Sequence, residues 1–179
     1  MNKKMNPNKL LNLENEFYKK PRINSRAKGN NFERALAKKL NSRFNTKEFC
    51  RTPGSGAFGT THTLPEHLKV HGDLITPESF KFVIEAKKGY DVKLEDIWKE
   101  KSDLYSFIEQ AKKDAKTSNR EWLLIYKKDR QKEIVITEKA HPIKEQLRIQ
   151  EKYYVYLLED FLSLPNEHFF ENFNDGFTY

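Results

Sequence analysis

Two neighbouring apolar runs of this sequence carry charged residues whose types and spacing suit metal-dependent chemistry. The first run contains Asp73, and the second contains Glu85 and Lys87. Glu85 and Lys87 stand two positions apart, so on an extended strand both point to one face, while Phe82 and Ile84 point to the other. Charged groups in a largely buried strand need partners, and a divalent cation held by carboxylates is one arrangement that supplies them.

The carboxylates of Asp73 and Glu85 offer hard anionic oxygens, which suit Mg²⁺ or Mn²⁺, and the backbone carbonyl of Ala86 is a further candidate ligand. A cation bound here would polarise a phosphate and lower the pKa of a bound water. Lys87 would orient that water or neutralise charge in the transition state. The structural alternatives are a surface aspartate near a turn for Asp73 and a strand-edge ion pair with Lys87 or Lys88 for Glu85.

A helix upstream of these runs supplies a third carboxylate, Glu33. It lies in line with the apolar stripe of residues 36–44, so its side chain is expected to face inward. The helix is predicted to begin near Asn30 as its N-cap, with Glu33 in a capping box, and to end near Phe44. The alternative is that Glu33 serves only the helix N-terminus.

The remaining pattern predicts an α/β fold with a mixed central β-sheet flanked by α-helices. Strands are expected at residues 47–51, 71–75, 80–87, 122–126, 133–137 and 153–158, and the second and third of them are expected to form a β-hairpin. Helices are expected at residues 102–116 and from about Glu159, where Pro165 should break or restart the helix. Residues 52–70, with several glycines and prolines, are expected to form a long loop.

Composition favours one basic intracellular domain. The 179 residues carry 33 Lys and Arg against 26 Asp and Glu, a formal net charge of +7, which favours a polyanionic partner such as nucleic acid, although solubility alone is the simpler explanation. Residues 1–28 are expected to form a basic, Asn- and Lys-rich arm, and residues 29–179 the folded domain. The single cysteine, Cys50, allows no internal disulfide, and no apolar run is long enough to span a membrane.

Several basic and polar residues are candidates for phosphate contacts. For Arg51 and Ser55 the alternative is an ordinary mobile loop, and plain solvated charge is the alternative for the other four, Arg26, Lys28, Arg34 and Lys88. His62, His67 and His71 suggest a zinc site only weakly, because no cysteine pair completes a tetrahedral set. The sequence contains no Walker-type phosphate loop, HExxH pattern or nucleophile elbow, so neither a nucleotide cofactor nor serine hydrolysis is expected.

The pattern Gly72-Asp73 followed by Glu85-Ala86-Lys87 resembles the PD-(D/E)XK nuclease superfamily. Within that superfamily, the segments Gly29 to Arg34 and Arg51 to Gly56 look like the opening segments of archaeal-type Holliday-junction resolvases, and the resemblance covers about residues 28–127. It implies a restriction-endonuclease-like core. The interval from Glu33 to Asp73 is longer than in compact resolvases, which bears on substrate specificity rather than on the chemistry.

The resemblance also implies roles for individual residues. Glu33, Asp73 and Glu85 would form the metal site, Lys87 would assist the attacking water, and Gln110 matches a polar residue on the next helix. The implied activity is direct, Mg²⁺- or Mn²⁺-dependent hydrolysis of DNA.

The favoured substrate is a Holliday junction or other branched DNA, cut by a homodimer. The alternatives are a restriction-like or repair nuclease acting on linear DNA, and a nonenzymatic nucleic-acid-binding module that retains the fold. The small, basic, Asn- and Lys-rich chain suits a phage protein acting in the host cytoplasm.

Overall fold

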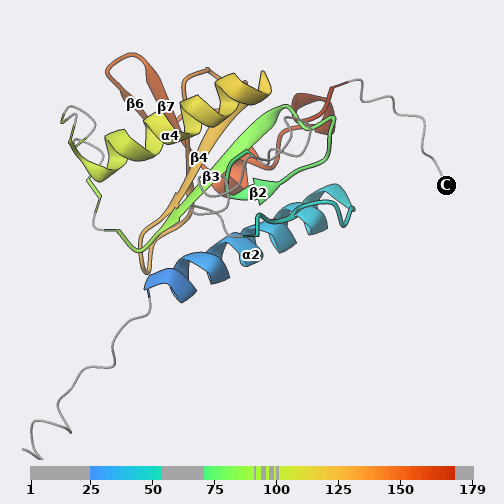
Figure 1. Cartoon of the computed structure of the whole chain (residues 1–179). Coiled ribbons are helices and arrows are strands. Elements are labelled where there is room, and N and C mark those ends of the chain that lie inside the picture. The colour runs from blue at the N-terminus through green and yellow to red at the C-terminus, as the bar shows by residue number, and fades with distance from the viewer. Residues whose placement is uncertain are drawn as a thin grey trace, which may run out of the picture.

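A five-stranded mixed sheet lies between two helices in the computed structural model (Figure 1), which describes residues 25–53, 71–90, 92–93, 96, 99 and 101–171. In chain order the elements are α2 (Ser25–Phe44), β1 (Cys50–Arg51), β2 (Leu74–Ile75), β3 (Phe82–Lys88), α4 (Asp103–Ser118), β4 (Glu121–Lys127), β5 (Ile134–Thr137), β6 (Leu147–Ile149), β7 (Tyr153–Leu157), α5 (Leu158–Phe161) and the 3₁₀ turn η3 (Asn166–His168). The strand order is β3-β4-β5-β7-β6.

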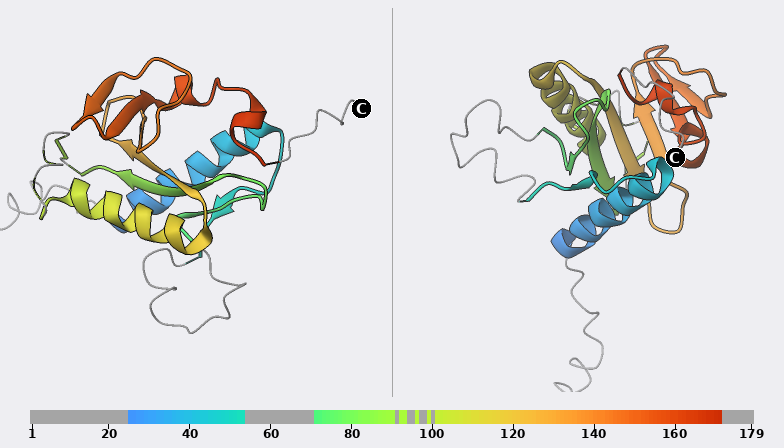
Figure 2. Two further views of the ribbon diagram at one scale, coloured as in Figure 1. Left: turned by 90° about the horizontal axis from the view of Figure 1, so that it is seen from above. Right: turned by 90° about the vertical axis from the view of Figure 1, so that its right-hand side faces the viewer.

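The sheet is mixed, as predicted, because one connection is a crossover. β3 pairs in parallel with β4 through α4, whereas β4, β5, β7 and β6 pair antiparallel. Figure 2 shows α2 on one face of the sheet and α4 on the other. Alternate residues of β3 therefore belong to two cores: Phe82 and Ile84 pack with α2, and Val83 packs with α4.

The first helix starts earlier than predicted. It begins at Ser25, five residues before the expected N-cap at Asn30, and ends at Phe44 as expected. The prediction of a capping box is wrong because Asn30 lies inside the helix rather than at its start. The side chains of Asn30 and Glu33 instead accept hydrogen bonds from the guanidinium of Arg51. The boundary expected between arm and domain at residues 28 and 29 thus falls inside α2, and residues 1–24 lie outside the described part of the chain.

The predicted β-hairpin is also wrong in its pairing. β2 pairs antiparallel with β1 to form a separate two-stranded sheet, and β1 is shorter than the predicted strand at residues 47–51. The residues just before β3 pair with the C-terminal segment instead of with β2. Phe80 forms a bridge with Phe170, and the N–H of Lys81 donates to the carbonyl of Phe169 at 2.8 Å. One hairpin-like hydrogen bond remains, from the N–H of Asp73 to the carbonyl of Ile84.

The second long helix and the later strands match the prediction closely. The Ser102 side chain caps α4 by accepting from the N–H of Tyr105, and the helix ends at Ser118, followed by the C-cap Asn119 in the left-handed conformation at φ 52°. Its buried face consists of Leu104, Phe107, Ile108, Ala111 and Ala115, the stripe predicted from the sequence. The short edge strand β6 was not predicted, because a three-residue strand gives no usable periodicity.

An aromatic cluster ties α2 and β3 to the C-terminal segment. The ring of Phe169 is 1% exposed and lies 4.9 Å from Phe44 and 5.7 Å from Phe161, centroid to centroid. Arg43 adds a hydrogen bond to the carbonyl of Leu164 at 2.6 Å. The C-terminal segment therefore holds in place the helix that carries Glu33. No helix in the described part of the chain is long and apolar enough to span a membrane.

Replacing Phe169 with alanine should lower the free energy of unfolding by about 3–5 kcal/mol, because the substitution removes a fully buried ring and leaves a cavity. Urea denaturation monitored by circular dichroism measures the change. Leu147→Ala, at a side chain that is 43% exposed, serves as the control and should shift stability by less than about 0.5 kcal/mol. Equal shifts in the two variants would contradict the assignment of the cluster as core.

Candidate active site

Main-chain hydrogen bonds hold Asp73 against β3. Its N–H donates to the carbonyl of Ile84 at 2.9 Å, and its carbonyl accepts from the N–H of Thr52 at 3.0 Å. Gly72 has φ 76°, and a Cβ atom there would lie 2.6 Å from the Ile84 carbonyl oxygen, so only glycine allows this approach. The Asp73 carboxylate is thereby placed over β3, where its Oδ2 accepts the N–H of Ala86 at 2.9 Å.

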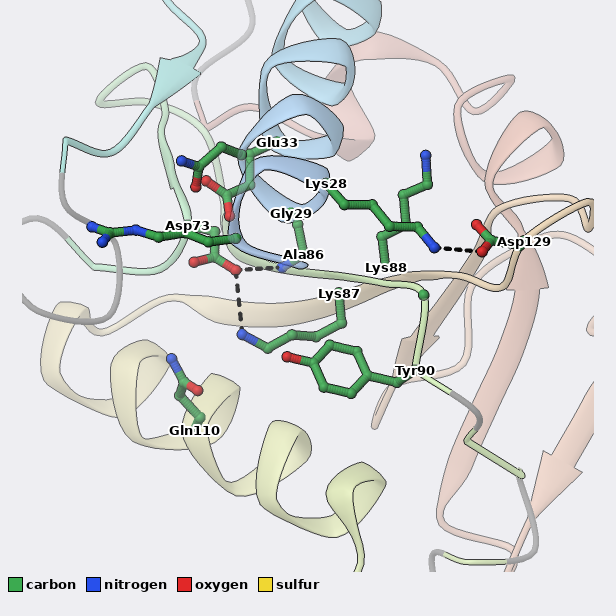
Figure 3. A pocket seen from close by; sticks show the side chains of 13 residues that line it. Lys28, Gly29, Glu33, Asp73, Ala86, Lys87, Lys88, Tyr90, Gln110 and Asp129 are labelled. Atoms are coloured by element: carbon green, nitrogen blue, oxygen red, sulfur yellow. Dashed lines mark hydrogen bonds and ion pairs between the residues drawn. The ribbon is translucent and has the colours of Figure 1, made fainter. Parts of the chain in front are cut away.

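Glu85 and Lys87 extend from β3 to the face covered by α4, which is the face that Val83 also occupies. The ammonium of Lys87 forms an ion pair with Glu85 and lies 3.7 Å from Oδ2 of Asp73 (Figure 3). The structure therefore brings together the three residues that the sequence singled out. Their contact is made across two chain segments that are not paired as a hairpin.

Burial and charge shape the titration of this group. Burial, together with the nearby charge of Asp73, raises the pKa of Glu85 to about 8, although Lys87 opposes the shift. Burial would lower the pKa of Lys87, but attraction to Glu85 and Asp73 outweighs it and the net shift is upward. Lys87 therefore stays charged at neutral pH, and a further cation beside Glu85 would favour the charged form of its carboxylate.

The donor atoms fit a hard divalent cation. Glu85 is 0% exposed, and apart from its ion pair with Lys87 neither of its carboxylate oxygens has a hydrogen-bond partner within the described residues. Such an oxygen pair beside a second carboxylate, Asp73, suits Mg²⁺, which commonly takes one or two carboxylates plus water and phosphate. No group of three or more His, Cys, Asp or Glu side chains in the described ranges is placed to hold a metal. Remaining ligands would come from the Ala86 carbonyl, water and substrate.

Glu33 faces inward, as predicted, and is 7% exposed. Its Oε2 accepts from Nε of Arg51 at 2.6 Å, and Nη2 of Arg51 donates to Oδ1 of Asn30 at 3.0 Å. Glu33 thus has a cationic partner other than Lys87, although it borders the same cavity as Asp73. Its role as a metal ligand stays a prediction, and so does a phosphate contact by Arg51, which the structure places against Glu33.

A cavity of about 600 Å³ opens beside these residues (Figure 3). Its lining comes from the first turns of α2, the end of β3 with the two residues after it, one position of α4, and single residues next to β2 and β4. The lining residues are Arg26, Lys28, Gly29, Asn30, Glu33, Asp73, Ala86, Lys87, Lys88, Gly89, Tyr90, Gln110 and Asp129. Glu85 lies beneath this surface. The cavity therefore joins the acidic centre to a cationic rim.

The predicted phosphate-binding and helix residues divide into three groups. Arg26, Lys28 and Lys88 line the cavity, and Gln110 enters it from α4. Arg34 does not line it; its Nη1 donates to Oδ1 of Asn31 at 3.3 Å. Ser55, the loop at residues 54–70 and the histidines at positions 62 and 67 lie outside the described residues, so neither the loop nor the zinc interpretation can be placed.

Sequence reasoning missed Asp114, one helical turn after Gln110 on α4. Burial raises the pKa of Asp114, while His71 and the N–H of Gly72 oppose that shift, so the carboxylate contacts the turn that carries Asp73. Its charge also contributes to the raised pKa of Glu85. The i, i+4 spacing from Gln110 is the signal that points to it.

Asp129 was missed as well, because it follows β4 and comes near α2 only through the fold. Its carboxylate forms an ion pair with Lys28 across the rim of the cavity (Figure 3).

Asp129→Asn should release Lys28 for phosphate and tighten DNA binding about two- to fivefold at low salt, with the gain vanishing at high salt. Fluorescence anisotropy in EDTA measures this.

The matched control for Asp129→Asn is Glu151→Gln, since Glu151 forms a comparable exposed ion pair with Arg148 and does not line the cavity. A similar tightening in both variants would show a general effect of net charge rather than competition for Lys28.

The mixed sheet between two helices and the buried group of Asp73, Glu85 and Lys87 define the PD-(D/E)XK class of nuclease. The family model described as "Phage putative PDDEXK endonuclease" matches residues 24–170, and the chain belongs to this family. Neither the curated proteins nor the solved structures give a significant match. The predicted superfamily and the restriction-endonuclease-like fold are confirmed, and the protein is a nuclease, a hydrolase whose substrate is nucleic acid. Nucleases of this class typically use divalent metal ions.

Proposed function

We propose that the protein is a Mg²⁺-dependent DNA endonuclease that cuts branched DNA, with a four-way Holliday junction as the favoured substrate. The single observation that carries the catalytic part is the buried carboxylate of Glu85, whose one partner among the described residues is the ammonium of Lys87, and which lies beside Asp73 under a cation-rimmed cavity. An anionic phosphodiester fits a cavity lined by Arg26 and Lys28.

The residues of the chain divide the work of hydrolysis. Asp73, Glu85 and the carbonyl of Ala86 would hold the metal ion, which when bound polarises the scissile phosphate and acidifies a water. Lys87, charged at neutral pH, neutralises negative charge that develops at the phosphorus. Glu33, held by Arg51, is the further candidate ligand, and Gln110, which lines the cavity from α4, would position water or phosphate.

Support for branched DNA comes from the two segments that resemble Holliday-junction resolvases. They meet in the folded chain, because Arg51 at the start of one binds Asn30 and Glu33 in the other. Symmetric resolution of a junction needs two active sites related by a two-fold axis, so the proposal includes a homodimer. The cation is Mg²⁺, with Mn²⁺ as a substitute that has the same preference for oxygen ligands.

Cleavage of a matched set of substrates tests the proposal. Labelled four-way junction, linear duplex and single strand are incubated with Mg²⁺, Mn²⁺ or EDTA, beside the Asp73→Ala variant. Paired symmetric cuts in the junction, with intact linear duplex, would support the resolvase, and sedimentation on the junction would report the dimer. Cutting of linear duplex at an equal rate would instead indicate a restriction-like or repair nuclease. Absence of metal-dependent cleavage on every substrate would leave only nucleic-acid binding.

A further inference from the structure

Tyr90 stands at the mouth of the active-site cavity with its ring turned partly to solvent. It follows β3 after Gly89, and it is 44% exposed, although it lines the cavity that contains Asp73 and Lys87. Within the described residues, the only other large apolar side chain with comparable exposure is Leu147 on β6, which does not line the cavity. The exposed ring of Tyr90 therefore lies at the candidate active site.

The ring of Tyr90 is supported from behind. Its centroid lies 4.9 Å from that of Phe107 in an edge-to-face contact, and its backbone carbonyl accepts the hydroxyl hydrogen of Tyr126 at 2.5 Å. The preceding residue is also fixed, since the N–H of Gly89 donates to the carbonyl of Lys127 at 3.0 Å. An exposed ring held in this way is pre-organised for a ligand, because little conformational freedom is lost on binding.

The same support connects Tyr90 to the reacting centre. The ammonium of Lys87 lies 5.3 Å from the centroid of Phe107, the ring on which Tyr90 rests. Figure 3 shows Tyr90 on the α4 side of the cavity and Lys28 and Lys88 on the α2 side. A phosphate bound between these cations and Lys87 would place the adjoining nucleoside within reach of the tyrosine ring.

We propose that Tyr90 is a stacking platform for a nucleobase next to the scissile phosphate, so that the enzyme favours DNA in which the base at the cut is unpaired or opens easily. This rests on the proposed nuclease function and narrows its substrate class. A cavity of about 600 Å³ is of the size that holds small ligands such as one nucleotide, and a base inside continuous duplex must unstack from its neighbours before it can enter such a pocket. Branch points and single-stranded ends offer such a base at lower cost than continuous duplex.

Binding in EDTA tests the proposal separately from catalysis. Four-way junction, flap and continuous duplex of the same sequence are labelled with 2-aminopurine at the branch point and at the equivalent position of the duplex. The wild-type chain should bind the branched forms at least about fivefold more tightly than duplex and quench the 2-aminopurine fluorescence, because base stacking on an aromatic ring contributes an effect of this size.

The variants separate stacking from packing. Tyr90→Ala and Tyr90→Leu should both lose the preference and the quenching, the second while keeping an apolar contact with Phe107, and Tyr90→Phe should retain both. Leu147→Ala, with similar exposure elsewhere, should behave as wild type. Retention of preference and quenching by Tyr90→Leu would overturn the proposal. A wild-type chain that shows the preference but no Mg²⁺-dependent cleavage would instead contradict the nuclease function.

Discussion

Replacing Glu85 with glutamine is expected to reduce metal-dependent cleavage at least about 1000-fold while DNA binding changes less than about threefold. The substitution keeps the size of the side chain but removes the buried charge that would hold the cation, and the loss of one such electrostatic element typically costs this much. Glu85 does not line the cavity, so we expect it to make no direct contact with DNA. Single-turnover cleavage and anisotropy in EDTA measure the two quantities.

The same variant should be more stable than wild type at high pH in the absence of metal. The pKa of Glu85 is raised to about 8 in the folded chain from its ordinary value of 4.5. A carboxyl group with a raised pKa contributes stability below pH 4.5 that is lost as the pH rises to 8, because the unfolded chain releases the proton first. Glutamine does not titrate, so the stability gap between Glu85→Gln and wild type should open over this range.

Addition of Mg²⁺ should close that gap, because a ligand that binds only the folded wild-type chain stabilises it. Glu121→Gln is the control: Glu121 pairs with Lys139 at the start of the neighbouring strand and is outside the cavity. That variant should cleave at the wild-type rate. Full cleavage by Glu85→Gln would place the metal site elsewhere and remove the basis for the roles of Asp73 and Lys87.

The centre of the site was predictable from the sequence because it depends on short-range geometry. The period of two on a strand put Glu85 and Lys87 on one face, and the period of 3.6 on a helix turned Glu33 inward. Both statements hold in the structure. The capping box at Asn30 failed because the helix extends back to Ser25, beyond the local signal. The side-chain acceptors of Asn30 and Glu33 are then bound by the guanidinium of Arg51, which is distant in the sequence.

Features that depend on contacts between remote segments were out of reach. The hairpin failed because the C-terminal residues Phe169 and Phe170 pair with Phe80 and Lys81, the two residues just before β3. Asp129 reaches Lys28 only after β4 aligns with β3, and nothing in either local pattern signals that meeting. Local periodicity thus predicts which way a side chain faces, whereas the identity of its partner needs the assembled fold.

Replacing Lys87 with methionine should separate metal binding from chemistry. Lys87 forms an ion pair with Glu85 and lies 3.7 Å from Asp73, so its ammonium neutralises the same oxygens that a cation would bind. Without it, the affinity for Mn²⁺ at pH 9 should rise about tenfold, since the loss of one charge at this distance is worth more than 1.4 kcal/mol at intermediate dielectric. In the Lys87→Met variant a proton also binds the Glu85 carboxylate more tightly and competes with the metal. The divalent ion nevertheless gains more, because its charge, and so its Coulomb energy with the carboxylates, is twice that of the proton.

Cleavage by Lys87→Met should nevertheless fall about 100- to 1000-fold. The variant binds the metal more tightly but lacks the Lys87 ammonium, whose charge stabilises the transition state. Titration calorimetry with Mn²⁺ and single-turnover cleavage give the two numbers. Lys88→Met, the next position on the opposite face of β3, should leave Mn²⁺ affinity unchanged, since Lys88 has no ion pair with Asp73 or Glu85 among the described contacts. Weaker Mn²⁺ binding by Lys87→Met would mean that the lysine positions the carboxylates for the metal instead of competing with it. The loss of cleavage would then follow from the disturbed metal site and not from a missing charge in the transition state.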